Sequence, residues 1–147
     1  MEDKLKWKAI LIGFAVDIGS SMALGLVFGI VWAVIMISGG TSPDDLEKEL
    51  KGDNTLLTMS ALLGLCCTLI GGYIAGRIAK QHHILNATFT GILSIFFSLL
   101  NVFFDRSLPI PLLVISILMV IPTAMLGGFF AKSLHGSVTE PIEDDLP

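Results

Sequence analysis

Residues 54–104 read NTLLTMSALLGLCCTLIGGYIAGRIAKQHHILNATFTGILSIFFSLLNVFF, and their only charged side chains are Arg77 and Lys80. The apolar run on either side of this pair exceeds the roughly 20 residues that a helix needs to cross the hydrocarbon of a bilayer. The polar residues between the runs leave room only for a tight turn. We therefore expect two antiparallel neighbouring helices, at about 56–79 and 84–104.

The flanking sequence adds two further spans. No Asp, Glu, Lys or Arg occurs in residues 18–43 or 107–131, whereas a soluble helix of that length needs polar residues on its water-facing side. We expect a first helix at about 7–37 and a fourth at about 109–132, with a kink at Pro122. The sequence thus predicts an all-α, polytopic membrane protein, in which residues 1–136 form one domain with four transmembrane helices in the lipid bilayer.

Two acidic segments carry most of the formal charge of −4. The first begins with Ser42 and Pro43, residue types that suit the N-cap and first position of a helix, and it predicts a short helix at 43–51 in water. The second, residues 137–147, is expected to be a disordered tail. Since no basic stripe accompanies them, nucleic acid is not expected as a partner.

The basic residues predict the orientation, because cytoplasmic loops of membrane proteins carry an excess of Lys and Arg. Three basic residues fall on one face, namely Lys48, Lys51 and Arg106, and six on the other, namely Lys4, Lys6, Lys8, Arg77, Lys80 and Lys132. We therefore expect a multi-pass protein of the cell (inner) membrane with both termini cytoplasmic and the short helix extracytoplasmic.

A Gly-Gly-aromatic segment ends both the second and the fourth span. Gly71-Gly72-Tyr73 and Gly127-Gly128-Phe129 lie at matching depth, which suggests two repeated helical hairpins. The alternative is a chance match between two glycine-rich membrane helices. Residues 71–79, GGYIAGRIA, resemble the helix end of small four-helix inner-membrane proteins of bacteria and archaea. This resemblance implies an inner-membrane location and assigns no activity and no site residue.

Asp17 is the ionisable residue that lies well inside a predicted span. A charge at that depth is costly, so such a residue usually faces the helix bundle and has a partner. By depth, we consider Thr90, the backbone near the two Gly-Gly pairs, and Arg77 as partners. Polar residues at four-residue spacing form a stripe on the third span that could line a path past Asp17, namely Asn86, Thr90, Ser94 and Ser98. Interhelical packing is the competing interpretation.

Small residues spaced by four allow helix backbones to approach closely, within one chain or between chains. The expected packing residues are Gly25, Gly29, Gly71, Gly72, Gly76, Gly127 and Gly128. Adjacent Cys66 and Cys67 lie in the middle of a span and are assigned to packing rather than to redox chemistry. The histidines lack the spacing of a metal site, so neither a metal nor a cofactor is expected.

No nucleophile, base and orienting acid can be assembled from the water-facing segments, so an enzyme is not expected. We consider two functions. The first is a non-enzymatic scaffolding, assembly or accessory-subunit role, in a homo-oligomer or with a partner membrane protein. The alternative is a small oligomeric transporter or channel that uses Asp17 as a proton or cation site.

Overall fold

The computed structural model describes residues 5–104 and 110–135, and every regular element within them is an α-helix. The elements are α1 (Trp7–Ser38), α2 (Leu46–Gly52), α3 (Asn54–Ala79), α4 (His83–Phe104) and α5 (Ile110–His135). Four of them, α1, α3, α4 and α5, are long and apolar enough to cross a membrane. The prediction of an all-α membrane protein with four spans is confirmed.

The short helix α2 begins later than the sequence pattern indicated. Asp45, rather than Ser42, occupies the position before the helix, and Pro43 lies in the preceding turn. The Ser42 hydroxyl accepts the Asp44 N–H at 3.4 Å, so it closes that turn instead of capping the helix. The predicted tail at 137–147 lies outside the described residues. Pro122 lies inside α5, which is helical on both sides of it.

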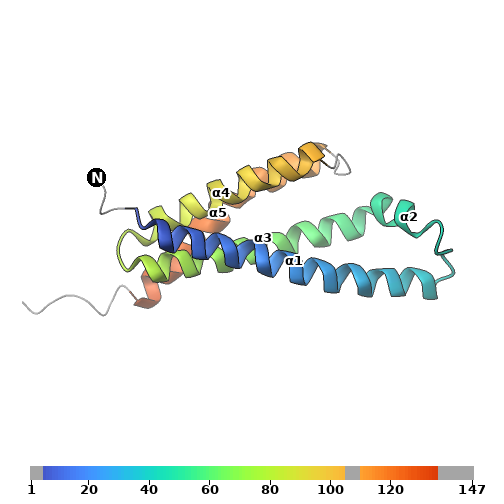
Figure 1. Cartoon of the computed structure of the whole chain (residues 1–147), viewed down its shortest axis with the longest axis horizontal. Coiled ribbons are helices and arrows are strands. Elements are labelled where there is room, and N and C mark those ends of the chain that lie inside the picture. Colours follow the sequence, from blue (N-terminus) through green and yellow to red (C-terminus); the bar gives the residue numbers. More distant parts are fainter. Residues whose placement is uncertain (1–4, 105–109, 136–147) are drawn as a thin grey trace, which may run out of the picture.

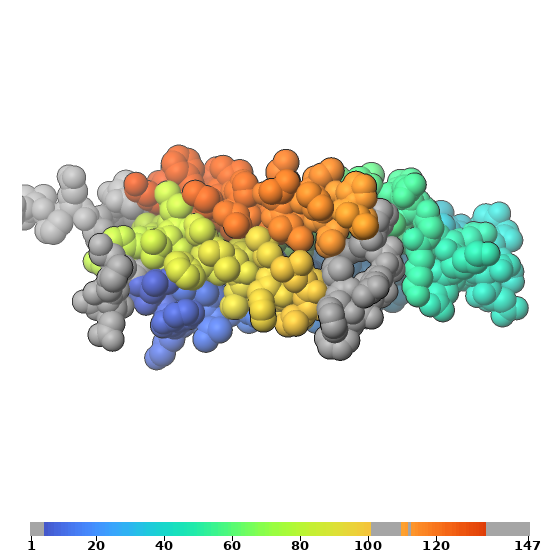
Figure 2. Space-filling model, turned by 90° about the horizontal axis from the view of Figure 1, so that it is seen from above, coloured from blue at the N-terminus to red at the C-terminus, as the bar shows by residue number. Residues whose placement is uncertain are grey.

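The four long helices form two pairs that converge at one end (Figure 1). The pair α1 and α3 and the pair α4 and α5 meet at the end that holds the start of α1 and the end of α5, and they diverge toward α2. Helix α3 packs most extensively against α5 and α1, and α4 contacts α5, α3 and α1. Figure 2 shows α4 and α5 lying along each other, with α2 extending beyond them.

Buried side chains occur only in the convergent part of the described bundle. The last buried residues are Asp17 in α1 and Ser94 in α4, and the first are Cys67 in α3 and Ala124 in α5. We call this part the packed half. The remainder of these helices has no buried residue among the described side chains and is called the splayed half; it comprises residues 18–38, 54–66, 95–100 and 110–123.

Small residues let the helices of the packed half touch through their backbones. A Cβ atom added at Gly72 of α3 would lie 2.5 Å from the Ala124 carbonyl oxygen of α5, and one added at Gly76 would lie 3.2 Å from the Gly128 Cα. A Cβ at Gly127 would meet the Leu69 carbonyl oxygen. Gly72 and Gly127 therefore face each other across the α3–α5 interface, where larger side chains would hold the backbones apart.

Candidate intramembrane polar site

Asp17 lies at the point where the two helix pairs begin to diverge. Its side chain is 4% exposed, and it accepts hydrogen bonds from two hydroxyl groups on other helices. Ser94 Oγ on α4 lies 2.5 Å from Asp17 Oδ2. Thr68 Oγ1 on α3 lies 3.2 Å from Oδ1 and 3.4 Å from Oδ2. Three helices thus each contribute one side chain to what we call the Asp17 cluster: Asp17, Thr68 and Ser94.

Glycine on both sides of the α1–α3 interface brings Asp17 close to its partners. A Cβ added at Gly71 would lie 2.8 Å from the Asp17 Cβ, and one added at Gly13 would lie 2.6 Å from the Ala75 Cβ. With larger side chains at Gly13 and Gly71, α1 would be displaced from α3. The carboxyl group would then move away from the Thr68 hydroxyl, which lies one turn along the same helix from Gly71.

Each hydroxyl of the cluster has a second acceptor within its own helix. Thr68 Oγ1 lies 3.1 Å from the Gly64 carbonyl oxygen, and Ser94 Oγ lies 3.1 Å from the Thr90 carbonyl oxygen. A hydroxyl carries one proton, so it donates either to the carboxylate or to its own helix. When it donates to its own helix, its oxygen can accept a hydrogen bond from the neutral carboxylic acid. The cluster can therefore satisfy Asp17 in both protonation states.

The other residues of the predicted stripe on α4 lie elsewhere. Thr90 is buried, and its hydroxyl donates to the Asn86 carbonyl oxygen at 3.1 Å. Asn86 is buried too, and its Oδ1 accepts the backbone N–H of Lys6 at 2.9 Å, tying the start of α1 to α4. Ser98 is exposed in the splayed half. Of this stripe, the structure brings Ser94 to Asp17.

Arg77 is exposed near the end of α3, and no Lys, Arg or His among the described residues forms an ion pair with Asp17. Thr68, which does contact Asp17, was missed by the sequence reasoning. Thr68 lies three residues before Gly71, whose backbone was expected to lie at the same depth in the membrane as Asp17. Only the crossing of α1 and α3, however, puts its hydroxyl on the face that meets Asp17.

The predicted packing glycines divide into two groups. Five of them pack against a neighbouring helix in the packed half: Gly71, Gly72, Gly76, Gly127 and Gly128. Gly25 and Gly29 lie in the splayed half, and a Cβ added at either one would meet nothing within 4 Å. The cysteines also differ, since Cys67 is buried and Cys66 is exposed.

The described bundle leaves no buried side-chain polar atom without a hydrogen-bond partner. It also holds no group of three or more His, Cys, Asp or Glu residues within its described part that could bind a metal ion. Comparison of the chain with family models, curated proteins and solved structures found no match.

Proposed function

We propose that this chain is a non-enzymatic scaffolding or accessory subunit that binds a transmembrane helix through its splayed half. The observation that carries the proposal is the contrast between the two halves of one bundle. In the packed half, small residues join all four helices, whereas residues 18–38 of α1 bury no side chain at all. That length of α1 is available to a second polypeptide or to lipid.

Gly25 and Gly29 make a second polypeptide the better occupant of this surface. Both are open, because a Cβ added at either one would meet nothing within 4 Å, and they are spaced by four residues on α1. Such pairs favour close helix contact in membranes, because small side chains permit backbone approach and van der Waals packing supplies much of the association energy. The partner is either another copy of the chain or a different membrane protein.

The test is purification of the tagged chain from native membranes in a mild detergent. We expect a stoichiometric partner, or a homo-oligomer, that is lost when Gly25→Leu and Gly29→Leu are combined. Val27→Leu is the matched control, since Val27 is 56% exposed and projects from a different face of α1. Recovery of a monomer without a partner from wild-type membranes would contradict the proposal.

We further propose that the protein lies in the inner membrane of a bacterium or archaeon with both termini in the cytoplasm. The support is the excess of Lys and Arg at the end of the bundle where α1 begins and α5 ends. A reporter fused to the C-terminus, active only in the cytoplasm, should be active. Activity of a periplasm-specific reporter at that position would contradict this orientation.

The Asp17 cluster favours a second candidate function, proton or cation translocation by an oligomer. A carboxyl group held by hydroxyls from two other helices, at the point where the helix pairs diverge, can exchange a proton without losing its hydrogen bonds. In proteoliposomes, Asp17→Asn should then abolish flux that the wild-type protein supports. Wild-type protein that moves no ion in a broad screen would eliminate this candidate.

A further inference from the structure

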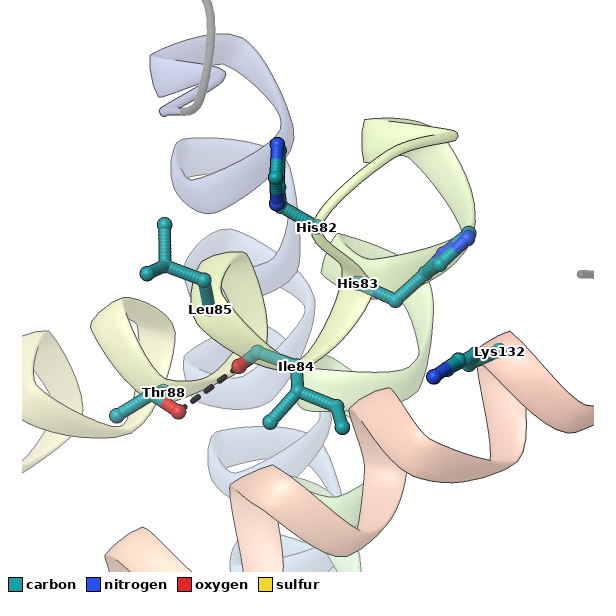
Figure 3. A pocket seen from close by; sticks show the side chains of 6 residues that line it. All are labelled: His82, His83, Ile84, Leu85, Thr88 and Lys132. Carbon is teal, nitrogen blue, oxygen red and sulfur yellow. Dashed lines mark hydrogen bonds between the residues drawn. The ribbon is translucent and has the colours of Figure 1, made fainter. Parts of the chain in front are cut away.

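An open pocket lies at the packed end of the bundle, between the start of α4 and the end of α5 (Figure 3). Its volume is about 500 Å³, within the roughly 300–1,000 Å³ typical of small-molecule sites. The pocket is lined by His82, His83, Ile84, Leu85, Thr88 and Lys132. Neither the proposed helix contact nor the Asp17 cluster uses any of these residues.

The pocket combines a cation with an apolar wall. The Lys132 side chain extends from α5 toward His83 and Ile84 in the first turn of α4 (Figure 3). Lys132 is exposed and forms no ion pair with the described residues. Ile84 and Leu85 continue the surface along α4 in the direction of the membrane core, so one molecule would meet the cation at its polar end and these side chains along its apolar part.

The hydrogen bonds around the pocket fix its shape. His83 Nδ1 lies 2.6 Å from the Gly76 carbonyl oxygen, and because a carbonyl only accepts, this nitrogen carries the proton. The Thr88 hydroxyl donates to the Ile84 carbonyl oxygen at 2.8 Å. His82, with a φ of 51° in the turn after α3, is exposed, and its ring points away from Lys132 (Figure 3). Lys132 is therefore the cation that a ligand in the pocket would meet.

The charges of the described residues favour an anionic ligand in the pocket. Among the described residues, every acidic side chain except Asp17 lies in the segment 44–53, at the opposite end of α1 and α3. The pocket end instead carries the basic residues Arg77 on α3 and Lys132 on α5. A phosphate group is the anion that a membrane supplies at this depth, where basic pockets between transmembrane helices bind anionic headgroups.

We propose that this pocket binds an anionic phospholipid, with its phosphate near Lys132 and its upper acyl carbons against Ile84 and Leu85. The site is independent of the helix partner proposed above. The bound lipid would attach the packed half to the anionic leaflet and hold the start of α4 against the end of α5. Unlike general solvation by the bilayer, the site would select lipids by the charge of their headgroup.

Native mass spectrometry of the detergent-purified full chain tests the proposal, with phosphatidylglycerol and phosphatidylcholine of matched acyl chains as probes. Wild-type protein should retain phosphatidylglycerol preferentially. Lys132→Gln should lower that retention about fivefold, the effect of one lysine near a membrane anion. Lys8→Gln is the control with the same change of charge, at an exposed position of α1 outside the pocket lining, and should retain the lipid as wild type does.

A second variant places a negative charge inside the pocket without altering a basic residue. Leu85→Glu, at a position 39% exposed, should likewise reduce phosphatidylglycerol retention. Equal losses in Lys8→Gln and Lys132→Gln would indicate general charge attraction and overturn the proposal, as would equal retention of the two lipids by wild type. Displacement of the lipid by millimolar inorganic phosphate would overturn it in favour of a soluble phosphate ligand.

Discussion

At the scale of single residues, the Asp17 carboxyl group joins three helices through two hydroxyl protons. Thr68 and Ser94 can each turn back to a carbonyl of their own helix, so the loss of Asp17 leaves neither hydroxyl unsatisfied. The cost of losing Asp17 is thus limited to the interhelical bonds themselves. Such bonds contribute about 0.6 kcal/mol on average in a membrane protein.

We accordingly expect Asp17→Ala to lower the free energy of unfolding by about 1 kcal/mol. Asp17→Asn should remain close to wild type, because its amide can accept from one hydroxyl and donate to the other. The measurement is unfolding by sodium dodecyl sulfate in mixed micelles, followed by circular dichroism. Asp17→Ala that is as stable as wild type would show that the cluster does not hold the helices together.

A matched threonine pair isolates the interhelical bond. Thr68→Val removes the single hydroxyl proton that is donated either to Asp17 or to the Gly64 carbonyl oxygen. Thr58→Val removes only a bond to the Asn54 carbonyl oxygen, since Thr58 is exposed in the splayed half. In the same unfolding experiment Thr68→Val should be the more destabilising. Equal effects would assign the stabilisation to the local bonds.

At the scale of helices, the sequence specified the spans far better than their contacts. Four long windows without Asp, Glu, Lys or Arg contain the apolar surface that needs lipid, so their number and approximate bounds follow from composition. Which small residues pack does not follow, because Gly25 and Gly72 look alike along their own helices. The difference arises where helix axes cross, and no pattern within one helix records that crossing.

The sequence also predicted the polar site and the start of α2 only in part. The four-residue stripe on α4 indicated a protein-facing side and included Ser94, but Thr68 stands on another helix without such a stripe. For α2, Ser42 and Pro43 matched a helix start in residue type. The Ser42 hydroxyl instead accepts the Asp44 N–H in a turn. A bond within the turn and a bond that caps the helix are of similar energy, so residue type alone does not decide between them.

Glycine substitutions provide a direct test of the two halves. Gly72→Ala should destabilise the protein by about 1–3 kcal/mol, because its Cβ would meet backbone atoms of Ala124 that cannot rotate away. Gly25→Ala should be neutral or slightly stabilising, since its Cβ would meet nothing and alanine is the better helix former. Detergent unfolding of both variants measures the difference. Equal destabilisation would contradict the division of the bundle into halves.

Asp53, which precedes α3, joins the start of α3 to the last part of α1. Its Oδ1 accepts the backbone N–H groups of Thr55 and Leu56 at 2.8 and 3.2 Å, and its Oδ2 accepts Trp32 Nε1–H at 3.0 Å. Partial desolvation raises the pKa of this carboxyl group, but the hydrogen bonds together outweigh that effect and lower the pKa below its ordinary value. The ionised form is therefore favoured in the folded protein.

This lowered pKa predicts an acid-sensitive contact. The stabilising contribution of Asp53 is fully present above the pKa of the unfolded chain, and it is lost as the pH falls through the lower pKa of the folded state. In a Trp7→Phe background, we expect the fluorescence of Trp32 to change below about pH 4. Asp53→Asn keeps an acceptor oxygen without titrating, so its fluorescence should stay flat; the same acid response in both proteins would exclude Asp53 as the cause.

At the scale of the whole molecule, one bundle places its helices in two different environments. The packed half excludes solvent through glycine and alanine contacts, and the splayed half exposes large apolar side chains on every span. Two features lie at opposite ends of the packed half. The Asp17 cluster lies where the helix pairs diverge, and the pocket beside Lys132, proposed to bind lipid, lies at the other end. Association with a helix would cover the splayed half, whereas a conduit would require water to reach Asp17 through it.

Single cysteines along α4 distinguish these two cases. In a chain without Cys66 and Cys67, we place a cysteine at Thr90, Ser94 or Ser98 and compare water-soluble with lipid-soluble maleimides in liposomes. Thr90 is fully buried and should react with neither reagent. If helix or lipid covers the splayed half, Ser98→Cys reacts only with the lipid-soluble reagent, whereas a cysteine at the exposed Ser42 reacts with both. Labelling of Ser94→Cys and Ser98→Cys by the water-soluble reagent would instead mean that water reaches Asp17, and the translocation candidate would replace the scaffolding proposal.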